Sequence, residues 1–144
     1  MKKQSIIPFL LSLLLVLTGC GNHVGLSGKV YFSDDQSPLT VGTVNFETDS
    51  FFARAPLKPD GRFVVGSLGD ADGLPPGQYR VYISGALESV TTGEGARATT
   101  TFEPLIDQKF MSAATSGIVI DITSTKRDFE IVVDRPAPAT TNRR

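Results

Sequence analysis

Two aspartates in a glycine-flanked loop have the spacing that comes nearest to a metal site. Asp70 and Asp72 stand in the segment Gly69-Asp70-Ala71-Asp72-Gly73, where both carboxylates can face one cation, as in calcium loops. A full calcium loop needs further oxygen ligands and a later glutamate, which are missing here in register. Calcium binding is therefore the alternative to a solvated turn in which both aspartates accept bonds from nearby backbone N–H groups.

Residues suited to nucleophilic or general-base chemistry are scarce. Cys20 is the single cysteine and His23 the single histidine, so neither an internal disulfide nor a zinc finger can form. We expect His23 to be a solvated linker residue that cannot be held within reach of a nucleophile. The acids are spread over turns and strand ends, unlike the paired carboxylates of a glycosidase. We expect no enzyme and no cofactor, with a metal-dependent or carboxylate-based hydrolase as the alternative.

The surroundings of Cys20 point to lipid attachment. Lys2 and Lys3 precede an apolar run at residues 6–16, and Leu17-Thr18-Gly19-Cys20 then sets small residues before the cysteine. The run is shorter than the roughly 20 residues that a spanning helix needs. This pattern is similar to the signal of bacterial lipoproteins. The resemblance implies a signal peptide at residues 1–19, acylation of Cys20, and a lipidated tether at residues 20–25.

The same resemblance implies a location in the bacterial cell envelope. Gly21 and Asn22 follow the cysteine, without the aspartate that in such lipoproteins signals retention at the inner membrane. We therefore expect the outer membrane rather than the inner one. Basic residues from Lys29 to Arg135 are spread along the sequence, without the clustered patch that a nucleic acid would need.

Alternating apolar residues predict short β-strands along the rest of the chain. Pro59 and Gly61 indicate a tight turn, and Gly77 is expected to take a positive φ that closes another. The expected strands are residues 26–32, 41–47, 51–57, 62–67, 79–84, 117–123 and 129–133. They predict one domain over residues 26–134, an all-β, seven-stranded antiparallel Greek-key β-sandwich without parallel pairing. Residues 135–144 are expected to be a flexible tail.

The segment between the fifth and sixth expected strands divides into two parts. Residues 89–101 are small and polar, so they bury too little surface to offset their ordering entropy and are expected to form a mobile, hairpin-like excursion. Residues 102–110 carry four large apolar residues, which predict a strip docked on the sandwich. These four are Phe102, Leu105, Ile106 and Phe110. Because loops on a rigid scaffold usually carry recognition, we expect the excursion to contact a partner.

Five side chains are candidates for partner contact. Tyr31 and Tyr82 should project from the outer faces of their strands, where aromatic rings can stack on a sugar or a protein. Arg97 lies in the excursion. Asp107 and Lys109 could form a recognition pair, although an exposed ion pair is the plainer interpretation.

Several short motifs, taken in order, resemble one family of exported domains. Asp-Gly-x-Phe and Pro-Gly-x-Tyr are common turn-and-strand patterns, and their order and spacing here are more specific than either alone. The matching segments are Gly28-Lys29-Val30, Pro59-Asp60-Gly61-Arg62-Phe63 and Leu74-Pro75-Pro76-Gly77-Gln78-Tyr79-Arg80-Val81, followed by residues 104–110, 115–118 and 128–131. They are similar to the carboxypeptidase regulatory-like, transthyretin-like domains of small planctomycete lipoproteins.

This resemblance implies a prealbumin-like sandwich and an exported, membrane-attached location, and it carries no established reaction. The related hydroxyisourate hydrolases use histidines and a C-terminal Tyr-Arg-Gly-Ser. This chain ends Thr140-Thr141-Asn142-Arg143-Arg144 and has no histidine after His23, which argues against that activity. The expected function is a lipid-anchored envelope β-sandwich with a non-catalytic binding or structural role. An envelope protein or a polysaccharide is the expected partner, besides the membrane itself.

Overall fold

The computed structural model describes residues 23–66, 73–123 and 127–138. The strands are β1 (Leu26–Phe32), β2 (Thr43–Glu47), β3 (Phe52–Pro56), β4 (Arg62–Val65), β5 (Gly77–Ser84), β6 (Leu87–Thr92), β7 (Thr99–Pro104), β8 (Ile118–Ile122) and β9 (Asp128–Val133). Two short 3₁₀ helices, η1 (Gly95–Arg97) and η2 (Gln108–Met111), interrupt them. The prediction of an all-β fold is confirmed for the described residues.

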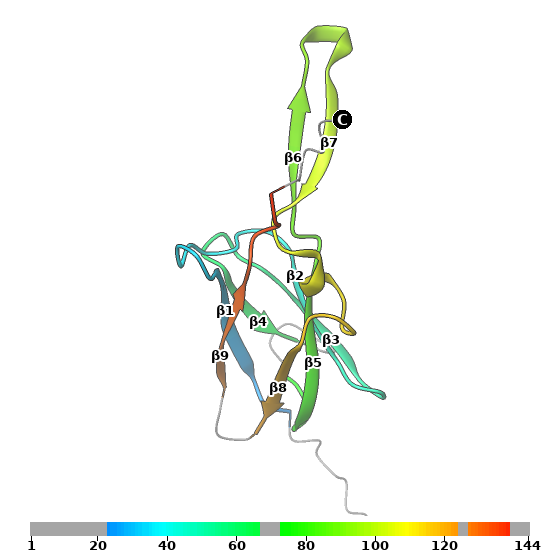
Figure 1. Ribbon diagram of the computed structural model, residues 1–144. Helices are drawn as coiled ribbons and strands as arrows, with labels where there is room; N and C mark the ends of the chain where they lie inside the picture. Colours follow the sequence, from blue (N-terminus) through cyan, green and yellow to red (C-terminus); the bar gives the residue numbers. More distant parts are fainter. Residues whose placement is uncertain (1–22, 67–72, 124–126, 139–144) are drawn as a thin grey trace, which may run out of the picture.

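Two sheets and one separate hairpin make up the described chain. The first sheet has the order β4-β1-β9 and the second β3-β2-β5-β8, while β6 pairs with β7 alone. The two sheets face each other, and the hairpin rises from one end of them (Figure 1). This is the layering of a β-sandwich.

The core lies between the two sheets because each strand turns its apolar residues inward. Along β1 every second residue is buried, beginning with Leu26 and ending with Phe32. Phe46 of β2 and Phe63 of β4 meet across the sandwich with ring centroids 5.9 Å apart. Tyr79 of β5 packs edge-on against Phe46 and donates its hydroxyl hydrogen to the Pro75 carbonyl at 2.9 Å. The turn before β5 is thereby fixed to the core.

Among the described residues, the two facing sheets hold seven strands, and β6 and β7 pair separately, where a hairpin-like excursion was expected. The expectation that no strands pair in parallel is wrong. β9 lies parallel to β1, from the pairing of Ser27 with Asp128 to that of Phe32 with Val133. Between β1 and β9 the chain forms all the strands of the second sheet. Two parallel neighbours need a long connection of this kind, because the chain must return to the same end of the sheet.

The turn before β5 agrees with expectation only in part. Gly77 has the expected positive φ, 157°, but it is the first residue of β5 and does not close the turn. The turn residue with a left-handed backbone in this stretch is Gly73, with φ 84°. A Cβ there would collide with the Val24 carbonyl oxygen. The turn predicted at Lys58 to Gly61 is confirmed, with the Gly61 N–H donating to the Lys58 carbonyl at 2.8 Å.

Both ends of the domain reach beyond their predicted limits. Val24, placed in the tether by its sequence, is only 5% exposed and pairs with Leu74 through backbone bonds of 2.7 and 3.0 Å. Arg135, placed in the flexible tail, is held by ion pairs to the loop after β1.

The predicted signal peptide, Cys20, Asp70 and Asp72 lie outside the described residues. Across the described ranges, no helix is long and apolar enough to cross a membrane.

Candidate functional site

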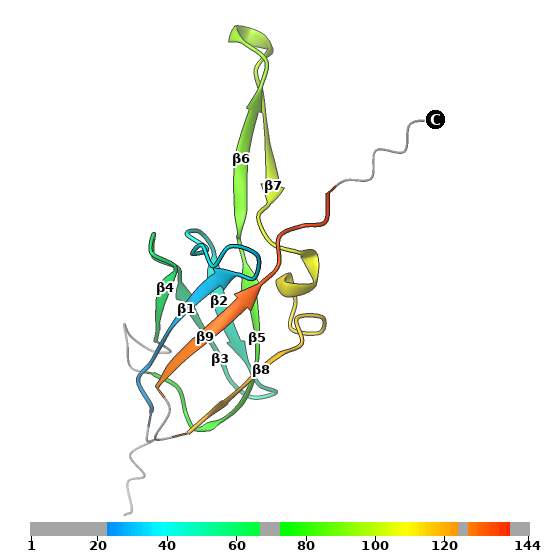
Figure 2. The ribbon, with the colours of Figure 1, turned by 60° about the vertical axis from the view of Figure 1, so that its left-hand side comes forward.

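The β6–β7 hairpin is the part of the described chain that projects from the sandwich. Six residue pairs join its strands, from Leu87 opposite Pro104 to Thr92 opposite Thr99. It stands clear of both sheets in two views, with η1 at its tip (Figure 1 and Figure 2). All its strand residues are exposed except Val90, which is half-buried. Among the described residues, neither outer edge of this ribbon pairs with another strand.

The two faces of the ribbon differ in charge. Directly opposed residues of an antiparallel pair share a face, and successive pairs alternate between faces. One face, here the neutral face, carries Leu87, Ser89, Thr91, Thr100, Phe102 and Pro104. The other, here the acidic face, carries Glu88, Val90, Thr92, Thr99, Thr101 and Glu103. On the neutral face Phe102 is 69% exposed and Leu87 is 39% exposed.

The prediction that residues 102–110 dock as one strip is correct only for its second half. Ile106 is fully buried and Phe110 is 7% exposed, and Leu105 packs partly against the core. Phe102 belongs instead to β7 and points to solvent. The docked part begins where the Leu105 N–H donates to the Ala86 carbonyl at 2.9 Å. Buried Ala86 and Ile106 therefore flank the base of the hairpin on its two strands.

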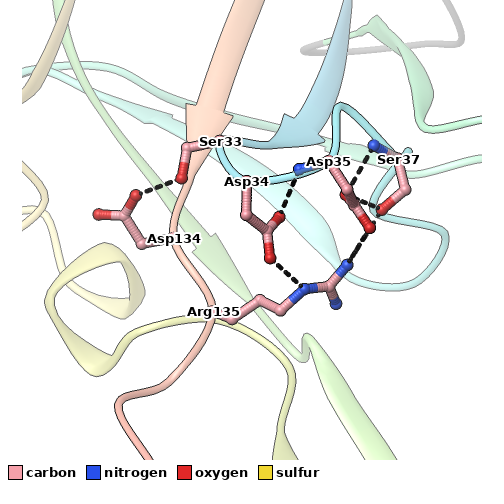
Figure 3. A network of polar contacts seen from close by, with 6 residues as sticks. All are labelled: Ser33, Asp34, Asp35, Ser37, Asp134 and Arg135. Carbon is pink, nitrogen blue, oxygen red and sulfur yellow. Dashed lines mark hydrogen bonds and ion pairs between the residues drawn. The ribbon is translucent and has the colours of Figure 1, made fainter.

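A polar cluster around Arg135 fixes the neighbouring end of the sandwich. The Arg135 guanidinium donates from Nε to Asp34 Oδ2 at 2.9 Å and from Nη2 to Asp35 Oδ2 at 3.0 Å (Figure 3). It also lies 3.8 Å above the ring centroid of Phe32. Bonds from the Ser37 hydroxyl and N–H, with Arg135 beside them, lower the pKa of Asp35 to about 2. This cluster ties the end of β9 to the loop that follows β1.

Asp134 continues this cluster toward η2. Its carboxylate accepts from Lys109 Nζ at 2.6 Å and from the Ser33 hydroxyl at 2.7 Å, and these bonds lower its pKa. The sequence suggested an ion pair between Asp107 and Lys109. That prediction is wrong, because Lys109 pairs with Asp134 instead. Asp107 instead caps η2 by accepting the Lys109 backbone N–H at 2.9 Å. Each charged group of this arrangement is held by hydrogen bonds to other protein groups, which is consistent with a structural role.

Two open grooves lie beside η2. One, of about 410 Å³, is lined by residues that include Arg80, Tyr82 and Met111. The other, of about 590 Å³, is lined by residues that include Asp107, Lys109 and Met111. Arg80 is engaged by Asp49 at 3.0 Å and Glu47 at 3.7 Å. Its charge is therefore not free to attract an anion into the groove.

The structure separates the five predicted contact residues into three places. Tyr82, Asp107 and Lys109 line the adjoining grooves. Tyr31 lies on the first sheet and donates to Glu130 Oε2 at 3.2 Å. Arg97 stands at the tip of the hairpin, in η1. These residues do not form a single surface.

The sequence did not reveal Leu87 and Phe102 as neighbours on one exposed face. The signal was the register of two threonine-rich strands, which becomes readable only once they are known to pair.

The described residues contain no group of three or more His, Cys, Asp or Glu side chains that could hold a metal ion. His23 is exposed at the start of the described chain.

Comparison with known proteins offers little. No family model matches the chain, and no curated protein matches it. The crystal structure of a 9R-lipoxygenase from Cyanothece PCC8801 is similar over 92% of this chain and 18% of that chain, with 14% identity and a TM-score of 0.33. A likeness this slight says nothing about the activity of this chain.

Proposed function

We propose that the chain is a lipid-anchored β-sandwich of the bacterial cell envelope with a non-catalytic binding or structural role, and that its β6–β7 hairpin is the interaction arm. The observation that carries this proposal is the hairpin itself. Its strands form six regular pairs, although almost every residue in them is exposed. A ribbon of this kind adds nothing to the core, so its regular structure is better explained by contact with another molecule.

The scaffold supports the role of an arm. Ala86 and Ile106 are both fully buried at the two roots of the ribbon. The nearby bonds of Lys109 and Arg135 also hold the end of the sandwich beneath it. Recognition segments are commonly presented on rigid supports of this kind.

The direction of the hairpin also fits a membrane-attached protein. The described chain begins at the end of the sandwich opposite the hairpin (Figure 1 and Figure 2). Val24 is docked at that end, only a few residues after Cys20. An acyl chain on Cys20 would therefore place the membrane near one end of the domain and point the hairpin away from it.

The remaining parts of the proposal come from the resemblance to the transthyretin-like lipoprotein domains. They are a Greek-key, prealbumin-like strand order and a preference for the outer membrane. Two facing sheets around one core support the first, with the parallel β1–β9 pair as an added feature.

A shortened hairpin tests the proposed arm. Residues 91–98 are deleted, and Thr99→Asn and Thr100→Gly supply a two-residue turn between the paired Val90 and Thr101, because Asn-Gly favours the type I′ turn of hairpins. In whole cells treated with formaldehyde, the unmodified protein should form a discrete adduct that the shortened protein, which keeps Leu87 and Phe102, forms more weakly. The melting temperature should not change, since the deleted residues are exposed.

A variant on another surface serves as the control. Tyr31→Ser alters the outer face of the first sheet, far along the chain from the hairpin, and should leave the adduct intact. An adduct that survives hairpin shortening and disappears with Tyr31→Ser would move the binding role from the hairpin to the sheet.

A further inference from the structure

The hairpin lacks the additional layer that two-stranded ribbons normally need. An isolated pair of strands is marginal in water unless a third strand or a second layer covers an apolar face. Among the described residues, the neutral face leaves Phe102 69% exposed and Leu87 39% exposed. The chemistry of that face therefore limits what can cover it.

Charge distinguishes the two faces as contact surfaces for an identical molecule. In a two-fold symmetric contact each patch meets a copy of itself, so a patch of one charge repels its partner. The acidic face already places Glu88 directly opposite Glu103, a cross-strand pair of like charges that is unfavourable in itself. The neutral face has no charged residue among its six. Only the neutral face can meet its own copy without repulsion.

We propose that the neutral face of the β6–β7 hairpin packs against the neutral face of a second copy of this chain. Phe102 of both copies would lie in the middle of this contact, with Leu87 toward the base of the hairpin and Thr91 and Thr100 toward its tip. This inference rests on the proposed role of the hairpin as the interaction arm.

Attachment to one membrane gives the required geometry. Copies anchored near Val24 all point their hairpins in the same direction, away from the anchor. A two-fold axis along the membrane normal then sets two ribbons side by side, with their neutral faces together. The contact is small by the standards of stable dimers, so confinement to a surface, which raises the effective concentration, is part of the mechanism.

Site-specific photo-cross-linking tests the inference in cells that make the full chain. The photoreactive residue benzoylphenylalanine replaces Phe102 on the neutral face or, as a matched control, Val90 on the acidic face. Because Val90 lies within the same ribbon, the two positions differ chiefly in the face they report. We expect the variant with the photoreactive residue at position 102 to form an adduct of twice the chain mass. The variant with this residue at position 90 should form no such adduct.

Each alternative outcome has a distinct meaning. An adduct from position 102 to a different protein overturns the second-copy inference and leaves the interaction arm standing. The absence of any adduct from both positions overturns the arm as well. A stronger adduct of doubled mass from position 90 overturns the assignment of the neutral face.

A charge exchange gives an independent test. Ser89→Lys sets like charges on the neutral face and should abolish the doubled adduct from position 102, whereas Thr92→Lys on the acidic face should not. Co-expression of Ser89→Lys and Ser89→Glu copies, carrying different tags, should restore a mixed adduct. Failure of the mixed pair to associate, with both variants folded by their melting temperatures, would contradict contact between the two neutral faces.

Discussion

Arg135 shows how single polar side chains close this domain. Its guanidinium bridges Asp34 and Asp35, and the apolar part of the contact lies over Phe32. The pair is half-exposed, so its contribution to stability is modest. Its effect is mainly geometric, because it joins the loop after β1 to the chain leaving β9.

The lowered pKa of Asp35 predicts a dependence of stability on pH. A carboxyl group whose pKa falls from 3.8 to about 2 on folding stabilises the fold above pH 4 and loses this contribution as the pH falls toward 2. Asp35→Asn should therefore lower the melting temperature at pH 6, and the difference from the unmodified protein should shrink as the pH approaches 2. A difference that is constant from pH 6 to pH 2 would show that the charge of Asp35 plays no part.

Gly73 is the residue whose backbone conformation matters most in the turn before β5. Gly73→Ala should reduce the free energy of unfolding by at least about 1–3 kcal/mol, because a left-handed φ is strained for alanine and its Cβ would strike the Val24 carbonyl. Gly25→Ala is the control, since no atom lies within 4 Å of its Cβ position, and should change it by less than about 0.5 kcal/mol. Urea unfolding measures both, and equal values would refute the assignment of the turn.

At the scale of elements, the boundary between hairpin and docked segment lies just after Pro104. Ile106→Ala should cost about 2–5 kcal/mol, as large-to-small changes at fully buried sites do. Phe102→Ala should cost less than about 0.5 kcal/mol, because the ring is largely exposed. Thermal or urea unfolding of the two variants separates these cases. A larger loss from Phe102→Ala would restore the expectation that Phe102 is docked.

Limited proteolysis examines the same boundary without mutation. Arg97 lies in an exposed turn at the hairpin tip, whereas Lys109 is in η2, held by Asp134. Trypsin should therefore cut after Arg97 well before it cuts after Lys109, as mass spectrometry of early fragments would record. Early cleavage after Lys109 would mean that η2 opens more readily than the hairpin tip.

The sequence predicts those elements whose apolar residues alternate. The predicted strand at residues 26–32 coincides with β1, and Ile118, Ile120 and Ile122 share the inward face of β8 as expected. Alternation shows which face of a strand is buried but not which strand lies beside it, so the parallel β1–β9 pair was not predictable. Threonine-rich β6 and β7 bury no residue fully and have no alternating apolar pattern, so the sequence predicted a hairpin-like excursion there without its strand register.

The polar part of the candidate site was still less predictable. Lys109 and Asp134 are 25 residues apart in the chain, and only the fold brings them together. Arg135 looked like the start of a polar tail because its partners, Asp34 and Asp35, lie at the other end of the sequence. The prediction for Asp107 failed for a local reason, since its carboxylate is used to cap η2.

At the scale of the molecule, the two ends of the sandwich have different roles in this account. The described chain begins at one end, beside the Val24–Leu74 pair, and the hairpin projects from the other (Figure 2). A lipid on Cys20 would make the first end face the membrane and the second face the partner. The proposed direction of the hairpin therefore depends on the proposed lipid at Cys20.

Mass spectrometry of the N-terminal peptide from isolated membranes tests this account most directly. The mature protein should begin at Cys20 and carry both thioether-linked diacylglycerol and an N-acyl group, and Cys20→Ser should yield a non-acylated chain that keeps Lys2 and Lys3 or leaves the membrane fraction. An unmodified Cys20 in membrane-associated protein, or a mature chain that begins at another residue, would contradict the lipid anchor and with it the proposed orientation of the hairpin.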